Sequence, residues 1–127
     1  MKKIFCLLTL FIATTFTAFA DVKYDITLPL KGETEADLLL QRNILGNLLP
    51  FVQVTNKGCE YFSIPNTKLV HSVKNGKVRD GKYVEGYWRE IWSVNACGKV
   101  INYPILFTLD GNGGTYFKIE AKKGIHY

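Results

Sequence analysis

A carboxylate lies between two tryptophans in the segment W-R-E-I-W at 88–92. In an extended strand alternate side chains point to the same face, so Trp88, Glu90 and Trp92 share one face. Two indoles and an acid lining a cleft would suit a sugar, a peptide or a cationic group. Because burying an unpaired carboxylate is costly, the pattern also fits an internal acid paired with a lysine, Arg42 or a backbone amide. The sequence leaves both interpretations open.

Glu90 and Asp110 are the acids that a small glycan hydrolase would use, and that chemistry needs two carboxylates ~5–10 Å apart. Histidine chemistry has less support. His126 is next to last in the chain, and no motif places a nucleophile or an acid beside His71. Two histidines cannot form a closed zinc site alone. We therefore predict no catalytic residue, no metal and no cofactor.

The segment D-G-N-G-G at 110–114 has the composition of a phosphate-binding or calcium-binding loop. A phosphate loop requires Gly-Lys-Ser/Thr and a following helix, and an EF-hand loop requires a closing glutamate. The segment has neither feature, so we expect a hairpin turn.

The first 20 residues have the form of a Sec-type export signal. Lys2 and Lys3 precede an apolar run, and Ala18-Phe19-Ala20 is a small-x-small cleavage site. We predict cleavage after Ala20, no membrane span afterwards, and a single domain over 21–127 in the periplasm or outside the cell. Cleavage leaves 107 residues with a net charge of +3.

Removal of the signal also leaves two cysteines, Cys59 and Cys97. An even count in an exported domain predicts one disulfide, because that compartment is oxidising. Lysine pairs at 74/77 and 122/123 fall short of the basic runs that indicate nucleic-acid binding, so we expect no nucleic-acid partner.

One helix is expected over 35–49, with Thr34 as its N-cap and Pro50 ending it. Its apolar positions recur at the i, i+4 spacing of a buried helix face: Ala36, Leu40, Ile44 and Leu48. Before it, 21–32 suits an edge strand or an extended arm.

After the helix the period changes to two residues. The pattern predicts strands at 51–54 and 59–64, a break at Pro65-Asn66, a strand at 67–74 and a broad exposed loop at 75–81. Strands at 83–97, 101–109 and 115–121 follow, and Pro104 indicates an edge position or a bulge. Tyr103 lies on the apolar face of its strand, so we add it to Trp88, Glu90 and Trp92 as a candidate binding residue.

These elements predict an α+β domain with one N-terminal helix packed on an antiparallel meander of four to six strands. The order is similar to cystatin-like and NTF2-like domains, which implies no activity. The W-x-E-x-W, C-G and D-G-x-G-G-T elements between 86 and 115 resemble small exported bacterial proteins of unassigned function. That resemblance supports export and a β-rich core, and it brings no catalytic residue.

The leading expectation is a non-enzymatic binding or inhibitor-type protein. Its partner would be another envelope or extracellular protein, or a small ligand, with the 75–81 loop as a second contact surface. The alternatives are the Glu90 hydrolase and a structural accessory of an envelope complex, whose first sign would be an exposed apolar patch.

Overall fold

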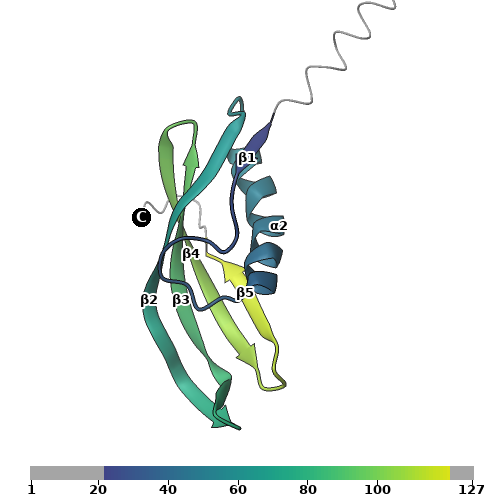
Figure 1. Cartoon of the computed structure of the whole chain (residues 1–127), viewed down its shortest axis with the longest axis vertical. Coiled ribbons are helices and arrows are strands. Elements are labelled where there is room, and N and C mark those ends of the chain that lie inside the picture. Colours follow the sequence, from purple (N-terminus) through teal and green to yellow (C-terminus); the bar gives the residue numbers. More distant parts are fainter. Residues whose placement is uncertain (1–21, 121–127) are drawn as a thin grey trace, which may run out of the picture.

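The computed structural model describes residues 22–120, apart from the side chain of Pro65. One helix packs on one face of a curved five-stranded sheet (Figure 1). The elements in chain order are β1 (Lys23–Asp25), α2 (Leu38–Thr55), β2 (Tyr61–Arg79), β3 (Lys82–Ala96), β4 (Lys99–Asp110) and β5 (Thr115–Ile119). The predicted α+β class with an N-terminal helix on a sheet is confirmed. The predicted export signal, the predicted cleavage site and His126 lie outside the described residues.

The sheet is mixed, with the spatial order β1-β2-β3-β4-β5. Strands β2 to β5 form the predicted antiparallel meander. Strand β1 pairs with β2 in parallel, so the prediction of a wholly antiparallel sheet is wrong. The reason is the crossover through α2, since a helix between two strands returns the chain in its original direction. As predicted, the segment around β1 forms an edge strand.

Helix α2 begins later than predicted. Asp37, not Thr34, is the N-cap, and its Oδ1 accepts a hydrogen bond from Leu40 N at 2.8 Å. Thr34 Oγ1 instead accepts from Ala36 N at 3.1 Å. Glu35 lies before the helix, and its backbone N donates to the Glu90 carboxylate of β3 at 2.9 Å.

The helix also continues beyond Pro50 to Thr55, so the predicted stop and the strand at 51–54 are both wrong. Ile44, Leu48 and Val52 repeat every four residues, and all three are fully buried. Burial of Val52 in the core favours continuation of the helix beyond Pro50. The carbonyl that loses its donor at Pro50 belongs to Gly46, and both residues lie on the exposed side of the helix, where water can replace the bond.

Strand β2 is one irregular strand of 19 residues where separate pieces were predicted. The register against β3 shifts between Ser63 and Asn66, so Pro65-Asn66 forms a bulge and does not end the strand. Asn75, with φ of 52°, lies within another shift, and the chain reverses only at Asp80-Gly81. The predicted loop over 75–81 is exposed, but most of it is strand.

Strands β3 and β4 supply much of the core. Along β3, every second residue from Trp88 to Ala96 is buried, as the alternation predicts. On β4 the buried face includes Tyr103, Ile105 and Phe107. Pro104 occupies an internal strand, and its carbonyl accepts from Glu120 N just beyond the end of β5. The nitrogen of Pro104, which has no hydrogen to donate, lies on the β5 side of β4. Because β5 ends at Ile119, no strand hydrogen bond is lost there, and a proline is tolerated.

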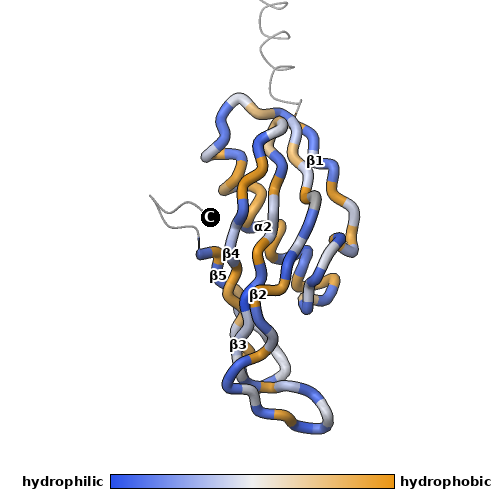
Figure 2. The backbone as a smooth tube through the Cα atoms, turned by 90° about the vertical axis from the view of Figure 1, so that its left-hand side faces the viewer, coloured by the Kyte–Doolittle hydropathy of each residue, from blue (hydrophilic) through white to orange (hydrophobic). Residues whose placement is uncertain are grey.

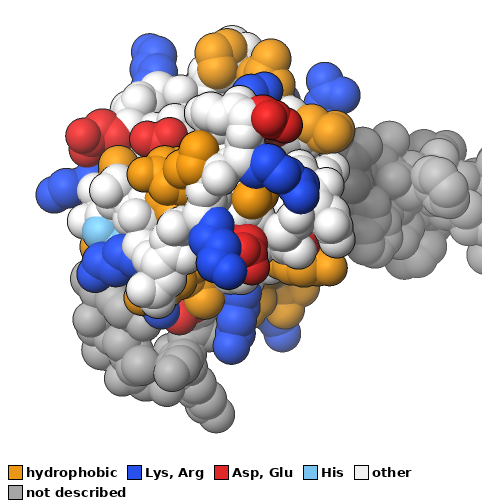
Figure 3. Space-filling model, turned by 90° about the horizontal axis from the view of Figure 1, so that it is seen from below, with side chains coloured by type: hydrophobic (Ala, Val, Ile, Leu, Met, Phe, Trp, Pro, Cys, Tyr) orange, Lys and Arg blue, Asp and Glu red, His pale blue; other side chains and the backbone are white. Residues whose placement is uncertain are grey.

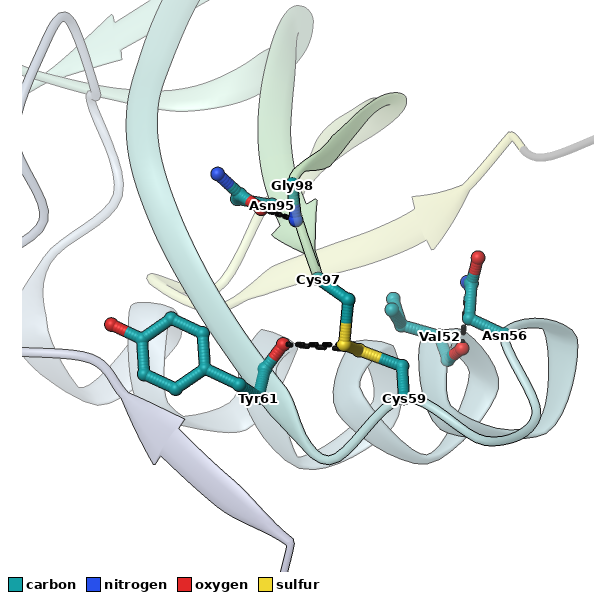
Figure 4. Close-up of a disulfide and its surroundings, with 7 residues drawn as sticks. All are labelled: Val52, Asn56, Cys59, Tyr61, Asn95, Cys97 and Gly98. Carbon is teal, nitrogen blue, oxygen red and sulfur yellow. Dashed lines mark hydrogen bonds between the residues drawn. A yellow bond between two sulfur atoms is a disulfide. The ribbon is translucent and has the colours of Figure 1, made fainter.

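The Cys59–Cys97 disulfide is formed, as predicted, with the two Cα atoms 5.8 Å apart (Figure 4). Cys59 lies between α2 and β2, and Cys97 lies in the β3–β4 turn. The backbone N–H of Cys97 also donates to the Tyr61 carbonyl at 3.2 Å. The bond therefore ties the end of the helix to one end of the sheet.

Candidate functional site

Glu90 is completely buried, and three N–H groups bind its carboxylate. Trp88 Nε1 and the backbone N of Glu35 donate to Oε2 at 2.8 and 2.9 Å, and Trp92 Nε1 donates to Oε1 at 2.9 Å. No basic side chain forms an ion pair with Glu90 in the described part of the chain. The strand periodicity that places both indoles beside the acid also makes them its donors.

The residues around this cluster are apolar and closely packed. Glu90 lies in register between Leu69 of β2 and Ile105 of β4. Trp88 stacks on Phe107 with ring centroids 4.6 Å apart. Trp88 and Trp92 are 5% and 0% exposed, so neither indole faces an open cleft.

Tyr103 is also buried, at 4% exposure, and contacts the edge of Phe51 of the helix with ring centroids 6.0 Å apart. Burial raises the pKa of its hydroxyl, and hydrogen bonds from Thr55 and Asn56 oppose that rise. Tyr103 therefore belongs to the interface between helix and sheet.

Glu90 is one of three buried polar residues in the described chain, and all three bind the segment before α2. We call this segment, residues 30–36, the strap. Gln41 accepts from Leu30 N at 3.0 Å and donates to the Ala36 carbonyl at 2.7 Å. Thr67 Oγ1 donates to the Lys31 carbonyl at 2.9 Å. With the Glu35–Glu90 bond, these contacts hold the strap over the edge of the core.

The structure thus brings Trp88, Glu90 and Trp92 together, as the sequence predicts, but as an internal network. Of the two interpretations of Glu90, it supports the internally paired acid. The backbone amide that the sequence allowed as a partner is that of Glu35, and Arg42 is exposed on the helix. Asp110 pairs in register with Glu85, five residues along β3, and is not a neighbour of Glu90.

Two surface depressions lie elsewhere. One, of about 230 Å³, lies between the start of α2 and the glycine-rich turn, and another, of about 260 Å³, lies beside Asp25 and Lys31. Neither is lined by Trp88, Glu90, Trp92 or Tyr103.

The glycine-rich segment is a turn between β4 and β5, as predicted. Asp110 Oδ1 accepts from the backbone N of Asn112 at 2.7 Å and of Gly114 at 2.9 Å. These two bonds hold the pKa of Asp110 below its ordinary value. The acid is therefore used to close its own turn.

His71 is half-buried on the face of the sheet opposite the helix. Its ring meets the edge of Tyr87, with centroids 5.7 Å apart, and Nδ1 lies 2.8 Å from the Ser72 carbonyl. Nε2 is buried with no hydrogen-bond partner among the described residues. Arg89, its register partner, is paired with Glu120 at 2.8 Å.

The projecting end of the β2–β3 hairpin exposes more surface than the sequence predicts. We call residues 68–85 the ribbon. All ten residues from Lys74 to Tyr83 are exposed, because the core begins only at Trp88 (Figure 2). Because the Asn75-Gly76 dipeptide is typical of a turn, the sequence predicts shorter strands than the structure has. The absence of apolar alternation near the ends of both strands is the feature that indicates an exposed hairpin here.

The ribbon carries the surplus positive charge of residues 21–127. It contains five basic residues and two acidic ones, whereas the rest of 21–127 contains nine of each. Figure 3 views this end of the molecule, where Lys and Arg side chains lie among hydrophobic and acidic ones. Val78 and Tyr83, which are register partners, are 60% and 54% exposed.

No family model, curated protein or solved structure matches the chain, so a function has to be inferred from its own geometry. No helix within 22–120 is long and apolar enough to cross a membrane. The same residues contain no group of three or more His, Cys, Asp or Glu side chains placed to hold a metal ion.

Proposed function

We propose that the protein is a non-enzymatic binding protein that works outside the cytoplasm and contacts its partner through the ribbon. The observation that carries the proposal is the uninterrupted exposure of 74–83 on a hairpin that extends beyond the core. Exposed apolar residues rimmed by charges are typical of contact surfaces. A hairpin of this length has no evident use in closing the core.

Location outside the cytoplasm is part of the proposal. Its support is the Cys59–Cys97 disulfide, because such bonds persist in oxidising compartments. The signal-like pattern of the first 20 residues is consistent with it. The periplasm and the extracellular space both satisfy these conditions.

The glycan-hydrolase alternative gains no support from Glu90. An acid that protonates a glycosidic oxygen has to reach the substrate, and Glu90 is 0% exposed, with both oxygens bound to N–H groups. Asp110 is the register partner of Glu85, five residues before Glu90 on β3, so Glu90 and Asp110 lie on different parts of the sheet.

A second candidate function, an accessory of an envelope complex, is favoured by the exposed face of α2. Arg42 is the one charged residue in the 18 of the helix. Leu38, Leu39 and Val54 are 53%, 65% and 67% exposed. Exposed apolar residues on a helix side with a single charge are suited to packing against another protein.

Capture of partners from an envelope extract distinguishes these surfaces. The bait is the chain without residues 1–20, because the core and the disulfide lie within 22–120. We expect Val78→Ser with Tyr83→Ser to abolish capture of a specific protein or lipid. Leu39→Ser with Val54→Ser should retain it.

Val100→Ser is the matched control, because Val100 is 55% exposed in the β3–β4 hairpin at the other end of β3. Loss of capture by the helix variant alone would favour the envelope-accessory function. Equal capture by all variants would contradict both proposals.

A further inference from the structure

The charges of the ribbon are arranged in an unfavourable way for an isolated hairpin. Arg79 and Lys82 face each other directly at the last register pair before the turn. Like charges at directly opposite positions destabilise a hairpin. Among the described residues, Arg79 reaches only a carbonyl, that of Gly111, at 3.3 Å. An anion beside this pair would relieve the repulsion.

The two acids of the ribbon do not neutralise its five cations. Glu85 is paired with Lys77 at 3.4 Å, and Asp80 lies in the turn itself. No ion pair involves Lys68, Lys74 or Lys82 in the described part of the chain. All three are exposed, and Lys82 lies beside the turn, whereas Lys68 is the register partner of Ile91 and lies far from the tip.

The cations nearest the turn share one face of the ribbon. Lys77 and Arg79 are two residues apart on β2, and Lys82 is the register partner of Arg79. The three lie within three residues of the Asp80-Gly81 turn, about 10 Å at ~3.3 Å per residue, which is about one Debye length. A charged plane that the tip approaches end-on therefore attracts all three.

The exposed apolar pair at the same end supports a lipid surface. Val78 and Tyr83 are register partners two and three residues from the Asp80-Gly81 turn. Tyrosine is enriched at the boundary between headgroups and hydrocarbon. Binding to a nucleic acid or another soluble polyanion would rest on the cations alone.

We propose that the tip of the ribbon docks on an anionic phospholipid bilayer, with Lys77, Arg79 and Lys82 at the headgroup phosphates and Val78 and Tyr83 at the headgroup boundary. This inference rests on the proposed function, in which the ribbon is the contact surface, and names the partner that it contacts. The docked protein would present its helix, core and disulfide away from the membrane.

The test is co-sedimentation of the chain lacking residues 1–20 with vesicles of phosphatidylcholine and phosphatidylglycerol in equal parts. Vesicles of phosphatidylcholine alone serve as the lipid control. We expect binding only to the anionic vesicles, and weaker binding as salt shortens the Debye length from ~10 Å at 0.1 M to ~3 Å at 1 M. Equal binding to both vesicles, or binding to neither, would overturn the inference.

Variants locate the contact. Arg79→Gln with Lys82→Gln should weaken binding roughly 25-fold, since each cation near an anionic surface contributes about fivefold. Lys99→Gln, at the start of β4 and at the opposite end of the sheet, should bind as the parent does. Tyr83→Ser should weaken binding without changing its salt dependence. Retention of affinity by the Arg79 and Lys82 double variant would overturn the inference, provided that its urea midpoint matches the parent's.

Competitors distinguish the bilayer from other anions. Inorganic phosphate should displace the protein no better than sodium chloride at the same ionic strength, and stronger displacement would indicate a site for single phosphates. Heparin binding tighter than vesicle binding would indicate a polyanion partner. If vesicles do not bind but ribbon variants still lose an envelope protein, the lipid assignment fails and the proposed function stands.

Discussion

At the scale of single residues, Glu90 acts as an acceptor inside the core. Its oxygens bind two indoles from its own strand and one backbone amide of the strap. Each of these N–H groups would be buried without an acceptor if the carboxylate were absent. Glu90 therefore positions the strap and orients both tryptophans, and its conspicuous place in the sequence has a structural cause.

Replacement of this acid tests that role. Glu90→Gln preserves the shape but puts an NH₂ group where an oxygen accepts, so at least one buried N–H loses its partner. We expect the free energy of unfolding to fall by about 1–3 kcal/mol. Urea titration followed by tryptophan fluorescence measures the change.

Glu85→Gln is the matched control on the same strand. The Glu85–Lys77 pair is exposed, with side-chain exposures of 47% and 76%, and should contribute no more than ~1 kcal/mol. Equal effects of the two substitutions would contradict the internal role of Glu90.

At the scale of elements, strand β2 combines a long open edge with repeated irregularity. Strand β1 covers only 61–63, and the register against β3 shifts several times beyond that point. Bulges and lysines on an edge strand hinder pairing with other chains. The same features give the ribbon its charge and its bends, so contact with a partner through side chains is favoured over addition of a strand.

Gly86 allows the ribbon to leave the core. Its φ is +120°, and a Cβ there would lie 2.8 Å from the Lys74 carbonyl oxygen and 3.0 Å from the Gly76 Cα. We expect Gly86→Ala to lower the free energy of unfolding by about 1–3 kcal/mol, because both the dihedral and the contact are unfavourable. Chemical denaturation measures this loss.

Gly46→Ala provides the contrasting control. A Cβ at this helical position meets nothing within 4 Å, so the substitution should stabilise the protein by about 0.5–1 kcal/mol. A stabilising Gly86→Ala would show that the ribbon does not need this backbone conformation.

At the scale of the whole molecule, the two ends of the sheet differ. One end is closed by the disulfide, which joins the α2–β2 connection to the β3–β4 turn (Figure 4). The other end carries the ribbon, which no disulfide and no helix covers (Figure 1). The disulfide thus lies at one end of the sheet and the exposed charged residues of the ribbon at the other.

Removal of the disulfide should destabilise the whole domain. The bond closes a loop with a sequence separation of 38, for which the chain-entropy model gives about 4 kcal/mol. We expect Cys59→Ala with Cys97→Ala to lower the free energy of unfolding by about 2–4 kcal/mol in urea. The reduced parent protein should behave like the double variant, and a loss below ~1 kcal/mol would show that the bond is dispensable.

Much of the fold could be predicted from local patterns. Alternation identified the buried face of β3 from Trp88 onward, and the cysteine count identified the disulfide. Three of the errors share one cause. Pro50, Pro65-Asn66 and Asn75-Gly76 each interrupt a local pattern, and each lies inside a continuous helix or strand. Packing of Val52 in the core and pairing of β2 with β3 outweigh those local preferences.

The candidate site shows the same division. By itself, the sequence determined that Trp88, Glu90 and Trp92 share a face, because side-chain direction in a strand depends only on spacing. It could not determine whether that face is open, since the strap and the helix that cover it come from residues about 40 to 60 positions away. The tertiary structure decided that the acid is internal and that the ribbon is the exposed surface. Burial depends on which distant segments meet, and only the folded chain brings those segments together.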